Sequence, residues 1–378
     1  MTSHAVRLES AGAAVTVVSA DRAVTDWSAR YFGPWWKAAE VPPESICAGP
    51  VVLAEVDPDV YADASLAVTQ APHTSTVYAK AQTLVARDET AGVIRAVSPE
   101  EALAYRSEPA GANLMIFGRD TEPVATATAR LAREVMRGML LRDGWAILHA
   151  SAVVQGGRTV LTFGQKGAGK TTTALALASQ HRWGLLANDR VFVRPNDAES
   201  VDVLPWPSAA ALGLGLLDAL GWFEIARERL QGGESLHPTQ DQRVTDALRG
   251  GRRKPLWENG KELKAQVFPD QFGHWFGVPL ATSGEAAALV FPRVDAKATP
   301  AVTDEVRGLS DDDFMSGATE DRYPDIFELA RVDGGGINES RHEVAHRLAA
   351  LPHHSVVLDH DVTANARFLA KLVGLQPY

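Results

Sequence analysis

The segment Leu161–Ala178 carries the residues whose types and spacing could do chemistry. It reads LTFGQKGAGKTTTALALA and contains the pattern Gly-x-x-x-x-Gly-Lys-Thr, with fixed positions at Gly164, Gly169, Lys170 and Thr171. Glycines let such a loop turn its backbone N–H groups toward an anion, because no Cβ stands in the way. The pattern is therefore typical of a loop that binds the phosphates of a nucleoside triphosphate.

The chemistry of a triphosphate suggests a role for each part of this loop. The ammonium of Lys170 is expected to reach the β- and γ-phosphates, and the hydroxyl of Thr171 to supply an oxygen ligand to Mg²⁺. A helix that begins at Lys170 would direct the positive end of its dipole at the same anion. We therefore predict ATP and Mg²⁺ as ligands, with these nucleotide-binding residues: Gly164, Gln165, Lys166, Gly167, Ala168, Gly169, Lys170, Thr171 and Thr172.

The residues on either side indicate the elements that must position the loop. Ala146–Val154 and Thr159–Phe163 are rich in β-branched residues, and a turn that contains Gly156 and Gly157 separates them. This pattern predicts a β-hairpin. The second strand runs into the loop, and the following sequence KTTTALALASQ predicts a helix. Strand, glycine-rich loop and helix in this order are the context in which the pattern has a mechanism.

A carboxylate is expected near the loop, because P-loop enzymes hold an acid at the end of a neighbouring strand. Asp189 comes just after the apolar run Leu185-Leu186-Ala187. We predict that it binds Mg²⁺ or accepts a proton. An aspartate that merely caps the strand is the alternative.

Residues 145–193 resemble the core of the HPr kinase/phosphorylase family and its relatives. That family has a His-Ala/Gly-Ser segment on a strand, a short hairpin, the phosphate loop, a helix, and a strand that ends in an Asp-Asp pair. The same order is found here. The resemblance implies an α/β fold with a P-loop kinase core of the HPr kinase and phosphoenolpyruvate carboxykinase type, rather than a GTPase fold.

The resemblance also implies roles for individual residues. His149 takes the place of the family's active-site histidine, and Asp189 takes the place of the second Asp of the pair, in the region of the catalytic base. Lys170 takes the place of the catalytic loop lysine, and Thr171 that of the Mg²⁺-binding hydroxyl. For His149, a hydrogen-bonded core residue is the alternative to a residue that orients the base or stabilises charge.

Two features depart from the family's pattern. The first residue of the pair is Asn188, which cannot accept a proton as a carboxylate does, so the base and metal roles would both fall to Asp189. The Glu-Val-Arg-Gly-Leu-Gly signature does not follow the pair; Asp304–Asp313, DEVRGLSDDD, echoes it much farther along the chain, and we interpret this echo as a coincidence. The chain is therefore not expected to act on HPr itself. It is more similar to the HPr-kinase-like proteins found with peptide-modifying and other specialised biosynthetic pathways.

The first third of the chain has a different pattern. Short runs rich in Val, Ile, Thr and Tyr, such as AAVTVVSA, PVVLAEV and NLMIFG, predict short antiparallel strands. Apolar residues recur at spacings of three and four from Glu122 to Leu141 and predict an amphipathic helix. We predict a smaller β-rich N-terminal domain over residues 1–118, which contributes no catalytic residue, and a P-loop kinase-like domain over residues 119–378. The polar segment Gly232–Glu262 is interpreted as a mobile loop, and the acidic VTDEVRGLSDDDF as a solvated surface segment.

Composition and charge bound the class of protein. The chain has 378 residues, of which 46% are hydrophobic and 22% charged, as in soluble globular proteins. Its net charge of −10 lacks the basic surplus of a nucleic-acid binder. No apolar run reaches the ~20 residues of a membrane span, no signal-peptide pattern opens the chain, and the single cysteine allows neither an intramolecular disulfide nor a cysteine metal site. We predict a cytoplasmic protein without nucleic-acid or membrane partners; self-association stays open.

Three functions are compatible with these features. An ATP-dependent kinase would transfer the γ-phosphoryl group to a hydroxyl of a peptide, protein or small-molecule acceptor. A P-loop ATPase or nucleotide-sensing module would act on a partner protein, although no Asn-Lys-x-Asp guanine reader is present. A degenerate module would bind ATP without chemistry, and Asn188 favours this last reading. The kinase is preferred; Leu204–Gly213 and Lys261–Gly277, which combine aromatic residues, Lys and Pro, are expected to face the acceptor unless these aromatics belong to the core.

Overall fold

The structure is a computed structural model that describes residues 3–42, 49–109, 113–315 and 324–374. The contacts between residues divide the chain into two compact units. The N-terminal unit comprises residues 1–145 and 315–338, and the C-terminal unit comprises residues 146–314 and 339–378. Each unit joins a large mixed sheet to helices, so the protein belongs to the α/β class. None of the helices in the described ranges combines the length and apolarity that a bilayer span requires.

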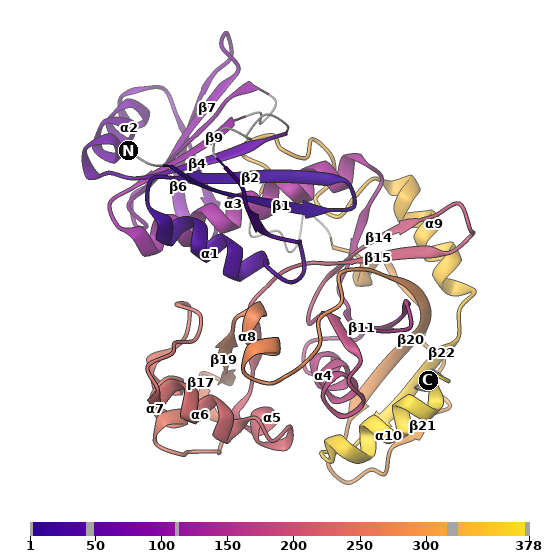
Figure 1. Cartoon of the computed structure of the whole chain (residues 1–378). Helices are drawn as coiled ribbons and strands as arrows, with labels where there is room; N and C mark the ends of the chain where they lie inside the picture. The colour runs from indigo at the N-terminus through magenta and orange to yellow at the C-terminus, as the bar shows by residue number, and fades with distance from the viewer. Residues whose placement is uncertain (1–2, 43–48, 110–112, 316–323, 375–378) are drawn as a thin grey trace. The chain divides into compact units, whose positions relative to one another are not determined.

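The N-terminal unit is built on a nine-stranded sheet, in which Figure 1 labels β1, β2, β4, β6, β7 and β9. The strand order is β3-β1-β2-β4-β9-β8-β7-β6-β5. Its strands are β1 His4–Ser10, β2 Ala13–Ser19, β3 Ala39–Glu40, β4 Val51–Val56, β5 Thr74–Tyr78, β6 Ala81–Asp88, β7 Val93–Ser98, β8 Leu103–Ser107 and β9 Asn113–Gly118. Its helices are α1 Arg22–Phe32, α2 Pro58–Gln70 and α3 Thr121–Arg142. The strands predicted for this region are confirmed.

Two aspects of this unit differ from the prediction. The strands are not all antiparallel, because β4 pairs in parallel with both β2 and β9. The helices α1 and α2 were missed, although Asp21 and Asp57 precede them and accept hydrogen bonds from the backbone N–H groups of their first turns. An aspartate in this position is a start signal for a helix.

The predicted amphipathic helix is confirmed as α3, and it belongs to the N-terminal unit. Its apolar face packs against α1 and against the strands β2, β4 and β9. The division between the units therefore falls after Trp145, whereas the predicted boundary near Gly118 separates this helix from the sheet that covers its apolar face. Local pattern identified the helix, but only the tertiary contacts show which sheet buries it.

The C-terminal unit is also built on a nine-stranded sheet, with the order β10-β14-β15-β20-β12-β11-β13 and β22 joined to β20 and β21. Its strands are β10 Ala146–Leu148, β11 Ser151–Gln155, β12 Arg158–Thr162, β13 Gly184–Ala187, β14 Val191–Pro195, β15 Val201–Pro205, β20 Gly284–Val294, β21 Ala301–Val302 and β22 His353–Leu358. Its helices around this sheet are α4 Lys170–His181, α9 Asn338–Ala349, α10 Val362–Leu372 and a 3₁₀ turn at Asp311–Asp313.

A second group of elements in this unit lies between β15 and β20 in the chain. It comprises β16 Ala210–Leu212, α5 Leu214–Ala219, α6 Phe223–Gln231, α7 Gln242–Arg249, β17 Leu256–Glu258, β18 Lys261–Leu263, β19 Ala265–Val267 and α8 Pro269–His274. The segment Gly232–Glu262, interpreted from its polarity as a loop, in fact contains α7 and the strand β17. The reason is that Val244 and Leu248 occupy one face of α7 and are buried there.

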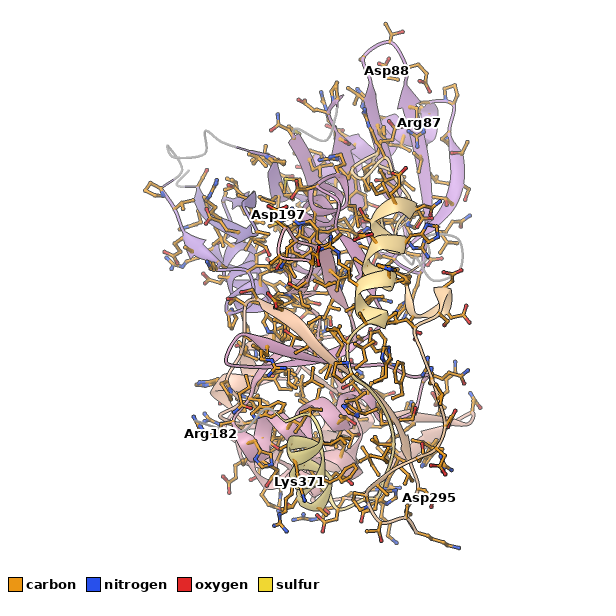
Figure 2. All side chains as sticks on the ribbon, turned by 90° about the vertical axis from the view of Figure 1, so that its right-hand side faces the viewer. Arg87, Asp88, Arg182, Asp197, Asp295 and Lys371 are labelled. Carbon is orange, nitrogen blue, oxygen red and sulfur yellow. The ribbon has the colours of Figure 1, made fainter. Side chains whose placement is uncertain are left out.

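The position of α4 follows from the parallel strands in the centre of the sheet. β12 pairs in parallel with β20, and β20 pairs in parallel with β22. α4 packs against β11, β12, β13 and β20, and also against α10. Because the loop before α4 follows β12, it lies at the carboxyl ends of parallel strands, where open α/β sheets bind their ligands. Arg182, which ends α4, and Lys371 on α10 both carry exposed side chains (Figure 2).

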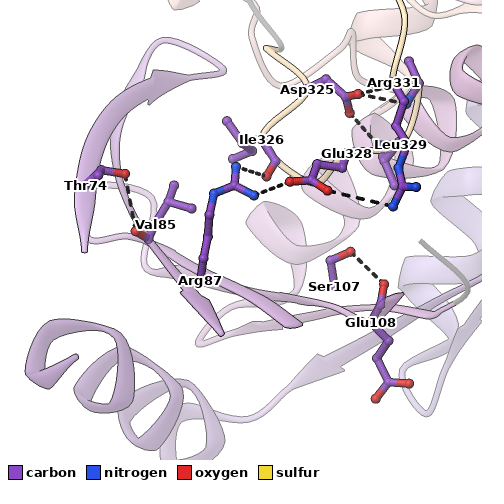
Figure 3. A network of polar contacts seen from close by, with 11 residues as sticks. Thr74, Val85, Arg87, Ser107, Glu108, Asp325, Ile326, Glu328, Leu329 and Arg331 are labelled. Carbon is purple, nitrogen blue, oxygen red and sulfur yellow. Dashed lines mark hydrogen bonds and ion pairs between the residues drawn. The ribbon is translucent and has the colours of Figure 1, made fainter. Parts of the chain in front are cut away.

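One described segment after residue 323 returns to the N-terminal unit. Phe327 packs edge-on against Tyr78, with 5.7 Å between the ring centroids. Arg87 donates a hydrogen bond of 2.6 Å to the carboxylate of Glu328, in the network of polar contacts that Figure 3 shows. This ion pair is exposed and contributes little to stability, so the buried aromatic contact is the stronger attachment.

Candidate functional site

The phosphate loop connects β12 to α4 within the C-terminal unit. The backbone N–H of Phe163 donates to the carbonyl of Val290 on β20 over 2.9 Å, so the chain stays in the sheet until the residue before Gly164. α4 begins at Lys170, directly after the loop. The N–H groups of a first helical turn have no acceptor within their own helix, and they carry the positive end of the dipole. The predicted strand, loop and helix are therefore all present.

Three glycines give the loop its shape. Gly164, Gly167 and Gly169 have φ values of 146°, 91° and 104°, a region that side chains of L-residues rarely adopt. A Cβ on Gly164 would lie 2.7 Å from the Cβ of Ala168 across the loop. The backbone can therefore curl tightly only because these positions lack a side chain, and turns of this kind can direct backbone N–H groups at an anion.

We expect Gly169→Ala to destabilise the protein more than Gly167→Ala does. A Cβ on Gly169 would lie 2.7 Å from Cγ2 of Val294, whereas a Cβ on Gly167 would meet nothing within 4 Å. Both substitutions place alanine at positive φ, so the difference between them isolates the steric clash. The free energy of unfolding, measured by urea denaturation, should fall about 1–3 kcal/mol further in Gly169→Ala. Equal losses in the two variants would contradict this packing of the loop against β20.

Lys170 is folded back over the loop. Its Nζ donates hydrogen bonds to the carbonyl oxygens of Gly164, at 2.5 Å, and Gln165, at 3.5 Å. The side chain is half-buried, so the ammonium is held close to the loop backbone and not extended into solvent. The structure thus places a positive charge at the loop, where the sequence predicts that the phosphates bind.

Thr171 is attached to the end of β13 through Asn188. The hydroxyls of Thr171 and Ser151 both donate to the backbone carbonyl of Asn188, over 3.2 Å and 2.7 Å. The side-chain oxygen of Asn188 accepts a hydrogen bond of 3.2 Å from the hydroxyl of Ser208. Asn188 is only 5% exposed. It therefore fixes the position of β13 beside the loop, a role that the sequence analysis did not assign to it or to the two serines.

Asp189 directly follows Asn188 in the chain, and its side chain is exposed. The described residues hold no group of three or more His, Cys, Asp and Glu side chains that could bind a metal ion. Mg²⁺ does not require one, because it commonly keeps several waters and binds one or two protein ligands together with phosphate oxygens. Thr171, at the start of α4, and Asp189, next in the chain to the Asn188 that Thr171 contacts, are the residues that would supply such ligands.

His149 lies where the predicted strand Ala146–Val154 is divided in two. β10 pairs with β14, whereas β11 pairs with β12, and His149 stands at the break between β10 and β11. Its backbone N–H donates to the carbonyl of Asp313 over 2.8 Å, and its side chain is half-buried. The predicted role of its imidazole stays a prediction, but the break explains how a residue within this run can leave the sheet.

Sequence reasoning assigned no role to Arg307 or Asp313. Their segment was interpreted as a solvated surface, and most of it is exposed, but Asp313 is only 5% exposed. Arg307 donates from Nη2 to the Asp313 carboxylate over 2.9 Å. Its Nη1 would lie 3.8 Å from a Cβ on Gly164. The sequence echo in Asp304–Asp313 was the one signal that could have directed attention to these residues.

The two segments predicted to face the acceptor are adjacent in the structure. β16, from Leu204–Gly213, pairs antiparallel with β19, from Lys261–Gly277. Ser208 connects the first of these segments to Asn188 and so to the phosphate loop. Several of their aromatic residues, including Trp206 and Phe272, are buried, as the alternative interpretation proposed.

Comparison with known proteins adds no family to these observations. Neither the protein-family models nor the curated protein sequences that were searched match this chain. The function must therefore be inferred from the chemistry of the site.

Proposed function

We propose that the protein is an ATP-dependent kinase that transfers a γ-phosphoryl group to a hydroxyl of a peptide, protein or small-molecule acceptor. The observation that carries the proposal is the arrangement of Lys170 over a loop of positive-φ glycines at the start of α4. Backbone amides, a helix terminus and an ammonium then converge on one anion-binding surface. The resemblance of residues 145–193 to the HPr kinase core favours phosphoryl transfer as the reaction at this surface.

In the proposed reaction, the acceptor oxygen forms a bond to the γ-phosphorus. The bond between that phosphorus and the β–γ bridging oxygen breaks, and ADP leaves. The proton of the acceptor hydroxyl passes to the carboxylate of Asp189, which is exposed and accessible to an acceptor. Lys170 and the loop amides bind the phosphates and stabilise the charge that develops on them. Mg²⁺, held by Thr171 and Asp189, would neutralise part of the phosphate charge.

A nucleotide-binding module without transfer activity is the second candidate. It is favoured by Asn188, whose side chain is buried and hydrogen-bonded to Ser208 in the place where the related family has a carboxylate. The site then has one carboxylate fewer than that family. The two functions make different predictions for the fate of the γ-phosphate.

The test is incubation of the full-length protein with Mg²⁺ and [γ-³²P]ATP, with and without a library of Ser-, Thr- and Tyr-containing peptides and hydroxylated metabolites. Label on an acceptor would support the kinase. Free phosphate alone would support an ATPase that acts on a partner, and an intact nucleotide that binds without turnover would support the sensing module. Either of these last two results would contradict the kinase.

A further inference from the structure

Arg307 approaches the phosphate loop from a distant part of the chain. It belongs to the segment between β21 and the 3₁₀ turn, and Nη1 is its atom nearest to the position of a Cβ on Gly164. Gly164 is the first residue of the glycine pattern. The guanidinium therefore lies at the edge of the surface on which the phosphates are proposed to bind.

An aromatic ring supports the guanidinium from β20. The Cζ atom of Arg307 lies 4.9 Å from the ring centroid of Phe291, the separation of a cation–π contact. Phe291 is 5% exposed and stacks on Phe163, with 5.6 Å between centroids. Phe163 directly precedes the loop. The packed pair of rings therefore connects the start of the loop to the ring on which Arg307 rests.

A buried carboxylate fixes the orientation of the guanidinium. Asp313 accepts from Nη2 of Arg307, and its other oxygen accepts from the backbone N–H of Ser310 at 3.0 Å and from the Ser310 hydroxyl at 3.2 Å. The backbone carbonyl of Asp313 accepts from His149. The carboxylate is thus held on both sides, and it is positioned to orient Arg307 without reaching the loop itself.

The planar fork of arginine lets one side chain do both tasks. The guanidinium presents several N–H donors in fixed directions, so one edge can bind a carboxylate while another meets a phosphate. Here Nη2 is bonded to Asp313, and Nη1 is directed toward Gly164. Arg307 is about one-third exposed, with 32% of its side-chain surface accessible, so an anion at the loop can reach it.

We propose that Arg307 donates hydrogen bonds to the terminal phosphate of ATP bound at the loop, and that Asp313 is the residue that positions it. This inference rests on the proposed function, because it requires a nucleotide at Gly164–Thr171. Besides Lys170, it assigns a second cation to the loop, from a distant part of the sequence. This cation would bind the γ-phosphate, which ATP has and ADP lacks.

The test compares the affinities for Mg-ATP and Mg-ADP by isothermal titration calorimetry, which needs no turnover. Arg307→Gln should weaken Mg-ATP binding about 10- to 100-fold, the range for a hydrogen bond to a charged group, and change Mg-ADP binding little. Arg307→Lys keeps the charge but not the fork, so its loss of Mg-ATP affinity should fall between wild type and Arg307→Gln. Arg182→Gln, at the exposed end of α4, is the matched control and should bind both nucleotides as wild type does.

The role of Asp313 is tested by its effect on Arg307 and not by stability alone. Asp313→Asn should lower the ratio of Mg-ATP to Mg-ADP affinity toward that of Arg307→Gln, and the double variant should show no further loss, because both changes act on one contact. If Asp313 had a purely structural role, Asp313→Asn would lower the affinities for Mg-ATP and Mg-ADP equally, or would shift only the midpoint of thermal unfolding. Either of those results would overturn the assignment of Asp313 as the positioning residue.

The outcomes separate this inference from the function on which it rests. If wild type binds Mg-ATP and Arg307→Gln keeps the same ratio of Mg-ATP to Mg-ADP affinity, Arg307 does not contact the terminal phosphate, while nucleotide binding stands. An equal loss for both nucleotides overturns the inference as well. If wild type binds neither nucleotide, both the inference and the kinase are overturned. If the ratio changes as expected but no acceptor is labelled, the inference stands and the kinase activity fails.

Discussion

Lys170→Ala is expected to remove nearly all phosphoryl transfer while the protein stays folded. The ammonium is hydrogen-bonded to the backbone of the phosphate loop, at the carbonyls of Gly164 and Gln165. Its loss should lower turnover by about 100- to 1,000-fold, the scale for a removed group that stabilises transition-state charge. It should also weaken Mg-ATP binding, because the same charge is proposed to face the β- and γ-phosphates in the bound state.

Lys371→Ala is the matched control for this experiment. Lys371 lies on the exposed surface of α10 and is labelled in Figure 2. The Lys371→Ala variant should bind Mg-ATP as wild type does in isothermal titration. The circular dichroism spectra of Lys371→Ala and Lys170→Ala should both match that of wild type. Equal Mg-ATP affinity in wild type and Lys170→Ala would show that the nucleotide does not bind at this loop.

The parts of the site that lie close together in sequence were predictable. The hairpin, the loop and the helix occupy one continuous stretch, and Gly156 and Gly157 form the turn between β11 and β12 at φ values of 56° and 79°. Glycine adopts such a conformation without steric cost, so two adjacent glycines in the sequence are enough to predict this turn. The same holds for α3, whose apolar spacing fixes its face before any partner is known.

The parts that depend on distant strands were not predictable from one sequence. β12 has β20 as its parallel neighbour, and β20 enters the sheet only after the intervening group from β16 to α8. Phe291 on β20 is what supports Arg307, and no local pattern reports that contact. The acidic composition predicted that Asp313 is exposed. Its carboxylate can nevertheless be buried, because it accepts hydrogen bonds from Arg307 and Ser310 and the guanidinium balances its charge.

Asn188 shows a different limit of sequence reasoning. Under the resemblance to the HPr kinase family, an amide in place of a carboxylate predicts a loss of chemistry. In the structure the residue has a positive role, because its carbonyl accepts from Thr171 and Ser151, and its side chain accepts from Ser208. An amide can fill this buried position without bringing a charge into it. The carboxylate of this pair of residues, Asp189, is at the exposed position next to it.

Asp189→Asn is expected to remove chemistry more than binding. The side chain is exposed, and Asp189 directly follows Asn188, the residue whose carbonyl is hydrogen-bonded to Thr171. The substitution keeps the shape and removes the charge. Turnover under saturating ATP and Mg²⁺ should fall by about 100-fold or more, as for a lost general base, while the affinity for Mg-ATP should fall only modestly.

Two further variants make this result specific to Asp189. Asp197→Asn removes the same charge from an exposed aspartate in the turn between β14 and β15, which is labelled in Figure 2, and should turn over as wild type does. His149→Ala should cost less than Asp189→Asn, because the backbone N–H that bonds to Asp313 remains and only the imidazole is lost. Asp189→Asn that turns over at the wild-type rate would show that another group accepts the proton, and the role carried over from the HPr kinase resemblance would then not apply to this residue.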